Sequence, residues 1–180
     1  MKLYSLFKFN HEIIKRFITK KSIVIDATCG NGHDTNYLAK LIPNGHIYSF
    51  DIQSSAINNA KILNEQFDNI TYICDSHENI LNHVDKNIDL VVFNLGYLPG
   101  GNLDITTNYT STINSINSCL EILKSGGCII VTIYTEHDNF SEANGIEKYV
   151  KTLNKYQYNV LKYQFMNLNH NPYSIFIEKK

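Results

Sequence analysis

The chain has 180 residues, of which 43% are hydrophobic and 18% are charged, and its formal net charge is −1. This composition predicts a globular protein that folds as a single domain over residues 1–180 and buries about 70% of its unfolded surface without disulfides or metal ions. The near-neutral charge argues against a protein that coats nucleic acid nonspecifically, because that affinity depends on many phosphate contacts.

Membrane and redox features are equally informative. No apolar stretch reaches the ~20 residues that span a bilayer, and the apolar core of the N-terminal segment is too short for a signal peptide, so we expect a cytoplasmic protein. The four cysteines are widely separated and form no Cys-x-x-Cys pair. We therefore expect free thiols in a reducing compartment, and no metal site.

Helical and strand patterns alternate along the chain without a linker or repeat. The expected helices lie near residues 10–20, 33–42, 53–66, 106–124 and 142–156. The expected strands lie near residues 22–26, 46–51, 70–74, 88–94, 127–134, 158–166 and 173–178. Such alternation predicts a parallel sheet with right-handed crossovers, while the last two strands are too close for a helix between them and must form an antiparallel hairpin. The sequence thus predicts an α/β, Rossmann-like fold with a mostly parallel seven-stranded sheet and a ligand crevice at the carboxyl ends of its strands.

The segment 26–35 follows the first strand and reads Asp-Ala-Thr-Cys-Gly-Asn-Gly-His-Asp-Thr. Gly30 and Gly32 permit positive φ and close approach of a ligand, as in a nucleotide-cofactor loop. Thr35 occupies the third glycine position of a pyrophosphate loop, and carboxylates would repel a pyrophosphate, so the segment favours S-adenosyl-L-methionine with its cationic amino-acid moiety. The alternative is an ordinary strand-to-helix turn. The residues expected to bind the cofactor here are Asp26, Thr28, Gly30, Asn31, Gly32, Asp34 and Thr35.

Two further segments support a nucleoside site. Asp51 ends the second strand, about 25 positions after Asp26 at the end of the first strand, and Gln53 follows shortly after it. A carboxylate at this position accepts ribose hydroxyls. The alternative is that Asp51 caps a helix that begins near Gln53. Ser76 and His77 follow the third strand, at the place expected for adenine contacts; the alternative is a helix N-cap by Ser76 and a surface histidine.

The fourth strand ends in Asn94-Leu95-Gly96-Tyr97. This spacing resembles the Asn-Pro-Pro-Tyr loop of amino-group methyltransferases, in which the Asn oxygen accepts a hydrogen bond from the target nitrogen and the aromatic ring stacks on the base. Asn94 and Tyr97 are therefore the candidate catalytic residues, with Asn94 also beside the cofactor. Leu95 and Gly96 replace the two prolines, and the alternative is a turn before a helix with Tyr97 in the core.

These segments, with Tyr134-Thr135-Glu136-His137 after the fifth strand, occur in the same order in the YtqB/MnmM family, which this chain resembles from His11 to its last strand. The resemblance implies a class I methyltransferase fold, S-adenosyl-L-methionine as cofactor, a tRNA anticodon stem-loop as substrate and a homodimer. It further implies methylation of the amino group of 5-aminomethyl-2-thiouridine at the wobble position. Tyr134 and His137 are the candidate substrate residues at the end of the fifth strand, and either is a candidate base if one exists.

Two segments and one basic cluster have no single interpretation from the sequence. The segment 136–139 departs from the family pattern, as does Asn10, which precedes His11 where the family often has Ala. A cluster of Lys15, Arg16, Lys20 and Lys21 is expected to contact tRNA phosphates, or is simply a solvated face. The alternative functions are methylation of ribosomal RNA or of a small-molecule amine and, from a different class, a dinucleotide-binding oxidoreductase or regulatory module.

Overall fold

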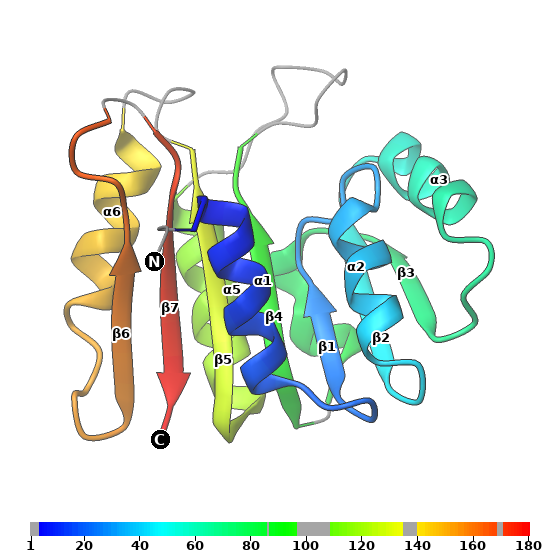
Figure 1. Cartoon of the computed structure of the whole chain (residues 1–180), viewed down its shortest axis with the longest axis horizontal. Coiled ribbons are helices and arrows are strands. Elements are labelled where there is room, and N and C mark those ends of the chain that lie inside the picture. Colours follow the sequence, from blue (N-terminus) through cyan, green and yellow to red (C-terminus); the bar gives the residue numbers. More distant parts are fainter. Residues whose placement is uncertain (1–3, 86, 97–108, 135–139, 169–170) are drawn as a thin grey trace.

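The computed structural model describes residues 4–85, 87–96, 109–134, 140–168 and 171–180. It contains a seven-stranded sheet with the order β3-β2-β1-β4-β5-β7-β6 (Figure 1). The parallel strands are β1 (Ile23–Asp26), β2 (His46–Asp51), β3 (Ile70–Cys74), β4 (Ile88–Asn94) and β5 (Leu123–Ile133). The antiparallel strands are β6 (Tyr158–Tyr163) and β7 (Tyr173–Lys179). The predicted parallel sheet with an antiparallel C-terminal hairpin is confirmed.

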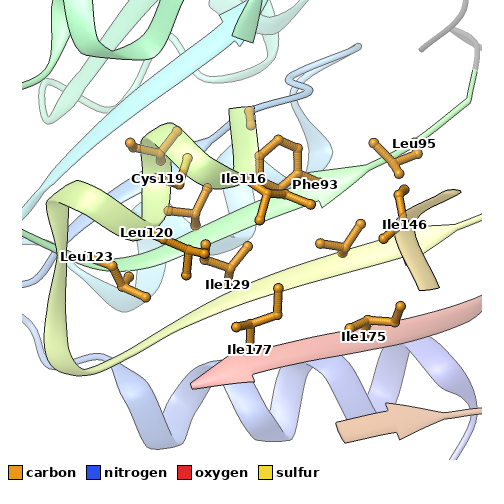
Figure 2. Close-up of a cluster of buried hydrophobic side chains, with 14 of the residues drawn as sticks. Phe93, Leu95, Ile116, Cys119, Leu120, Leu123, Ile129, Ile146, Ile175 and Ile177 are labelled. Carbon is orange, nitrogen blue, oxygen red and sulfur yellow. The ribbon is translucent and has the colours of Figure 1, made fainter. Parts of the chain in front are cut away.

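Helices cover both faces of the sheet because the central strands are apolar on both sides. Adjacent residues of β1 separate into two cores: Val24 packs in the core under α1 and α2, and Ile25 packs in the core under α4, α5 and α6. Figure 2 shows the second core, where side chains of α5 such as Ile116 meet Phe93 of β4 and Ile129 of β5. The helices are α1 (Leu6–Phe17), α2 (His33–Leu41), α3 (Ser54–Leu63), α4 (Ile80–His83), α5 (Tyr109–Ile122) and α6 (Ser141–Val150).

Several boundaries differ from the prediction. The first helix begins at Leu6, and α6 ends at Val150, several residues before the expected end. Strand β5 begins at Leu123, directly after α5, and its pairing with β4 shifts register before Cys128. The 3-10 helix η1 (His77–Asn79) and the short α4 were not predicted, because a single turn carries too few apolar residues to show a helical period.

The cysteines were expected to be buried free thiols, and Cys74 departs from this expectation because it is exposed. All four cysteines are free, and Cys29, Cys119 and Cys128 are buried while Cys74 is exposed. Burial raises the pKa of each of the three buried thiols to about 12, so they are protonated and inert at neutral pH. Within the described ranges, no helix combines the length and the hydrophobicity needed to cross a bilayer.

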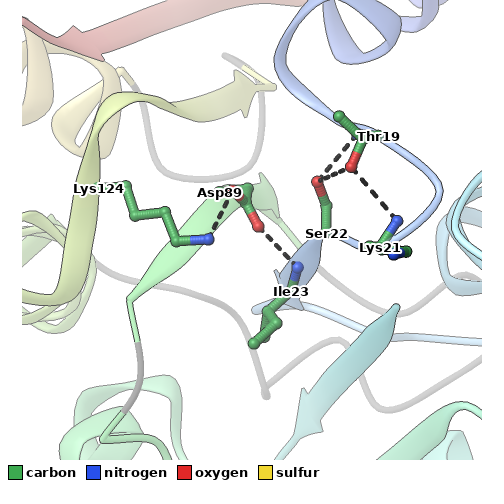
Figure 3. Close-up of polar contacts among 6 residues, drawn as sticks. All are labelled: Thr19, Lys21, Ser22, Ile23, Asp89 and Lys124. Carbon is green, nitrogen blue, oxygen red and sulfur yellow. Dashed lines mark hydrogen bonds and ion pairs between the residues drawn. The ribbon is translucent and has the colours of Figure 1, made fainter. Parts of the chain in front are cut away.

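The edge of the sheet at which β1 and β4 begin, here called the amino edge, has polar groups that pair with one another (Figure 3). The Asp89 carboxylate accepts hydrogen bonds from the backbone N–H of Ile23 and from Nζ of Lys124, both at 2.8 Å. Next to it, the backbone N–H of Thr19 donates to Oγ of Ser22 at 2.9 Å. These contacts join the start of β1 to β4 and β5, and they are a sufficient reason for polar residues at this edge.

Candidate functional site

The opposite edge, where the parallel strands end, is here called the carboxyl edge. Between β1 and α2 the chain makes the turn predicted from its glycines, with φ of 51° at Gly30 and 84° at Gly32. A Cβ atom at Gly32 would lie 2.7 Å from Cβ of Ala60 on α3, so the turn has no room for a side chain there. The backbone N–H of Cys29 donates to the carbonyl of Phe50 at 2.7 Å. The turn is therefore held against the end of β2.

Asp51 connects this turn to the segment after β2. Its Oδ2 accepts from the Gly30 N–H at 2.8 Å and its Oδ1 accepts from the Gln53 N–H at 2.9 Å. Helix α3 begins at Ser54 with Gln53 as its N-cap, so the alternative that Asp51 caps this helix is wrong. Each carboxylate oxygen has two lone pairs, and each therefore retains acceptor capacity for a ligand hydroxyl.

Three of the predicted cofactor residues contact other protein groups. Thr35 is fully buried, and its Oγ1 donates to Oδ2 of Asp26 at 2.6 Å beneath the turn. Asp26 is 1% exposed. The Asn31 side chain accepts from Nδ2 of Asn59 on α3 at 3.0 Å. These residues hold the turn in place, and direct contact with a ligand stays a prediction for each of them.

Asn94, at the end of β4, is tied to the turn and to α2. Its backbone N–H donates to Oγ1 of Thr28 at 2.6 Å, and its Nδ2 donates to Oδ2 of Asp34. Because an ionised carboxylate only accepts hydrogen bonds, this contact fixes which way the Asn94 amide is turned. The side-chain oxygen Oδ1 is then the atom with which Asn94 can accept a hydrogen bond from a substrate.

Two carboxylates at this edge have a raised pKa, chiefly because they are buried. Burial, with the Asp34 charge as the next cause, raises the pKa of Asp26 from its ordinary 3.8 to about 7. Burial also raises the pKa of Asp34, against the opposing effects of His11 and the hydrogen bond from Asn94. In the described part of the chain no Lys or Arg forms an ion pair with either carboxylate. A cationic group bound here would relieve this repulsion.

A pocket opens beside Asp34 and Asn94, between α1 and the carboxyl ends of β4 and β5. His11 lines it and stacks on Tyr37, with ring centroids 3.7 Å apart. Burial lowers the pKa of His11, so its ring is largely neutral at neutral pH. Asn10 also lines the pocket and is 6% exposed.

Sequence reasoning left Asn10 without a role, although a signal for it was present. Leu6, Asn10 and Ile14 follow one another at the four-residue spacing of a buried helix face, and all three are buried. A polar residue at the middle position of an apolar face requires a partner or a ligand.

Ser76 and His77, which follow β3, were predicted either to contact adenine or to be an N-cap and a surface histidine. Ser76 is the N-cap of η1 and accepts from the Glu78 N–H at 3.2 Å, which confirms the capping alternative. His77 is 9% exposed and is therefore not a surface histidine. The centroids of the His77 and Phe93 rings lie 5.9 Å apart in an edge-on arrangement, and burial lowers the pKa of His77. Contact of either residue with adenine stays a prediction.

The predicted substrate residues lie in different places. Tyr134 is half-buried after β5, and burial, followed by the Asp34 charge, raises its pKa. Tyr97 and His137 lie outside the described residues, as does the segment 135–139.

The predicted basic cluster lies at the end of α1 that is nearer the amino edge. Lys15 and Arg16 are exposed on the last turn of α1, and Nζ of Lys15 pairs with Glu12 at 3.0 Å. Helix α1 runs from the carboxyl edge toward the amino edge (Figure 1), and Lys20 and Lys21 follow it next to Ser22.

Comparison with known proteins places this geometry among methyltransferases. The family model "Putative rRNA methylase" matches residues 47–179. The chain is 31% identical to the Arabidopsis thaliana chloroplastic tRNA (mnm(5)s(2)U34)-methyltransferase, in an alignment that covers 94% of this chain and 68% of that protein.

Solved structures are similar over the whole chain. The crystal structure of a putative rRNA methylase from Clostridium thermocellum superposes with a TM-score of 0.96, at 35% identity and full coverage of both chains. A putative methyltransferase from Streptococcus mutans, crystallised in complex with SAH, gives a TM-score of 0.92 at 32% identity and covers 99% of this chain and 100% of that one. The class I methyltransferase fold implied by the sequence resemblance is thereby confirmed.

Proposed function

The chain belongs to the "Putative rRNA methylase" family, and on that premise we propose that it methylates the amino group of 5-aminomethyl-2-thiouridine at the wobble position of tRNA. Its family and its SAH-bound relative make it an S-adenosyl-L-methionine-dependent methyltransferase. The observation that carries the finer proposal is the Asn94 side chain, whose amide nitrogen is engaged by Asp34 and whose oxygen is left to accept from an amine. The name of the Arabidopsis relative supports the same substrate.

The residues of the carboxyl edge fit S-adenosyl-L-methionine in shape and in charge. Gly30 and Gly32 form a turn without side chains, along which a nucleoside can approach the backbone closely. Asp51 has acceptor capacity for the ribose hydroxyls, and Asp34 is an anionic partner for the ammonium group of the methionine moiety. When bound, the cofactor supplies an electrophilic methyl group on a sulfonium sulfur.

The role of Asn94 follows from the geometry of methyl transfer. An attacking amine must point its lone pair at the methyl group, so its hydrogens must be directed toward acceptors elsewhere. Asn94 Oδ1 is such an acceptor, and the hydrogen bonds to Asp34 and Thr28 fix its position. Holding the nucleophile in line in this way supplies up to ~7–11 kcal/mol in favourable cases.

The amine must also lose a proton before it attacks. Leu95, which follows Asn94, is 1% exposed and is held by a hydrogen bond from its N–H to the Thr132 carbonyl at 2.9 Å. Burial of an amine against such an apolar segment favours its neutral form, so the amine can release its proton to solvent as it enters the site. Tyr134 and His137 stay the candidates for a base.

The wobble base is unpaired in the anticodon loop, so little energy is needed to bring it to the carboxyl edge. Lys15 and Arg16, on the exposed last turn of α1, are the cations that we assign to phosphates of the anticodon stem. Lys15 is partly neutralised by Glu12, which limits its contribution.

Nucleoside mass analysis of RNA from cells that lack this protein tests the proposal. We expect tRNA to accumulate 5-aminomethyl-2-thiouridine, and we expect the methylated nucleoside to return to a much smaller extent with the Asn94→Ala gene than with the wild-type gene. An unchanged tRNA profile together with a methyl group missing from ribosomal RNA would assign the enzyme to ribosomal RNA instead, in keeping with the family name.

A further inference from the structure

An acceptor atom without a partner lies in the pocket beside Asn94. Asn10 is 94% buried, since only 6% of its surface is exposed. Its Nδ2 donates to Oγ1 of Thr132 on β5 at 3.1 Å, and Oγ1 of Thr132 lies 3.3 Å from Oγ of Ser174. Among the described residues nothing donates to Oδ1 of Asn10. A buried carbonyl oxygen in this state is costly unless a ligand or water supplies a hydrogen.

The other polar groups of this pocket define what such a ligand must carry. Asp34 presents a carboxylate and Asn94 an amide oxygen, and both residues line the same pocket as Asn10. The pocket is thus lined by three residues with acceptor oxygens, one each from α1, α2 and β4. An anion would be repelled by Asp34, and an apolar group would leave the Asn10 oxygen without a partner. A primary amine fits, because its protonated form has three donors and no acceptor.

We propose that this pocket holds a primary amine and that Asn10 is a positioning residue whose Oδ1 accepts one of the amine's hydrogens. Two amines have this chemistry: the ammonium group on the methionine moiety of the cofactor, and the aminomethyl group of the acceptor. The second source rests on the proposed function, whereas the first requires only that the protein binds the cofactor or its product.

Three variants separate this role from a structural one. Asn10→Leu removes the oxygen at similar size. Asn10→Asp keeps an acceptor, and the Thr132 hydroxyl can turn to donate to it. Thr132→Val breaks the tie between α1 and β5 but leaves Oδ1 of Asn10 in the protein. Thermal unfolding of each variant reports whether the fold is retained.

Calorimetry identifies a cofactor amine. S-adenosylhomocysteine is compared with methylthioadenosine, which has the same nucleoside but lacks the amino-acid chain. If the amine is the cofactor's, Asn10→Leu weakens S-adenosylhomocysteine about 10-fold or more, leaves methylthioadenosine unchanged, and is rescued by Asn10→Asp.

Binding of a short anticodon stem-loop RNA identifies an acceptor amine. The RNA carries either 5-aminomethyluridine or uridine at the wobble position. If the amine is the acceptor's, Asn10→Leu leaves S-adenosylhomocysteine unchanged and weakens only the aminomethyl RNA, again with rescue by Asn10→Asp.

The remaining outcomes overturn the inference. Equal weakening of all ligands by Asn10→Leu and Thr132→Val would make Asn10 only a tie between α1 and β5. If Asn10→Leu leaves the binding of S-adenosylhomocysteine unchanged and has the same effect on both RNAs, water satisfies the Asn10 oxygen. Failure of the proposed function alone would appear differently, as wild-type protein that binds S-adenosylhomocysteine in an Asn10-dependent way but ignores aminomethyl RNA.

Discussion

The two edges of the sheet use the same residue type in opposite ways. At the amino edge, Asp89 has a lysine and a backbone N–H as partners, and its charge is compensated within the protein. At the carboxyl edge, Asp34 and Asp51 are held by neutral amides, and burial raises the pKa of Asp34. The difference distinguishes polar residues that stabilise the fold from polar residues that we assign to ligand binding. Changing one edge while the other serves as its control tests this distinction.

The largest effect is expected at Asn94. Replacing Asn94 by Ala removes the oxygen that we assign to the acceptor amine, and loss of that alignment should lower kcat about 100-fold. Equilibrium binding of tRNA and of S-adenosylhomocysteine should change little. Turnover under saturating substrates, measured beside both binding constants, tests this. Losses of equal size in turnover and in tRNA binding would point to a structural role for Asn94.

Asp51 should come next. Asp51→Ala removes charge-assisted hydrogen bonds to the ribose and should weaken S-adenosylhomocysteine by about 1.5–3 kcal/mol, or about 10–150-fold in calorimetry. Unchanged affinity in a folded variant would contradict the assignment of Asp51 to the cofactor.

Asp89→Ala is the matched control at the amino edge. It removes the acceptor of Ile23 and Lys124 and should lower the free energy of unfolding by about 1–2 kcal/mol, while binding of S-adenosylhomocysteine stays the same. Denaturant melts and calorimetry on the same samples separate the two effects. A loss of affinity for S-adenosylhomocysteine in Asp89→Ala would contradict the distinction between the two edges.

A smaller effect is expected from pH. The pKa values of Asp26 and Asp34 are raised in the folded protein, that of Asp26 to about 7. Their contribution to the stability of the unliganded fold is therefore complete below the ordinary pKa of 3.8, and it is lost as pH rises through the raised values. A bound ammonium group prefers the ionised carboxylates, so affinity for S-adenosylhomocysteine should rise a few-fold from about pH 5.5 to about pH 8. Asp34→Asn should flatten this profile; a flat profile in the wild type would contradict the role given to these carboxylates.

The smallest effect is expected from the basic cluster at the end of α1. Replacing Lys15 and Arg16 by Gln should weaken tRNA binding and reduce its salt slope by about 0.7–0.9 for each phosphate that is no longer neutralised. The same change at Lys20 and Lys21, which follow α1 and lie farther from the carboxyl edge, should have less effect. Salt titrations of both double variants test the direction of approach, and a larger effect at Lys20 and Lys21 would place the RNA nearer the amino edge.

Much of this organisation could be predicted from residue patterns. Apolar runs such as Ile88–Asn94 identify strands covered on both faces, and the position of Asp51 after the glycine turn brings two loops together at one edge. Local patterns failed where tertiary contacts decide. Helix α4 is a single turn, and β5 starts inside a glycine-containing segment whose register depends on its pairing with β4.

The residues of the site could be predicted from the sequence, but the hydrogen bonds between them could not. The sequence indicated Asn94 and Asp34 separately, and only the fold shows that one donates to the other across 60 positions. Asn10 and Thr132 are 122 positions apart, so no local pattern joins them. The tRNA partner and the homodimer stay predictions.

The most direct test of the central claim is methyl transfer in vitro. Purified protein is incubated with S-adenosyl-L-methionine bearing an isotopically labelled methyl group and with tRNA that contains 5-aminomethyl-2-thiouridine, and the digested nucleosides are analysed by mass spectrometry. We expect label in 5-methylaminomethyl-2-thiouridine, and label that forms about 100-fold more slowly when Asn94→Ala replaces the wild type. Unlabelled wobble uridine from protein that still binds S-adenosylhomocysteine would contradict the proposed function.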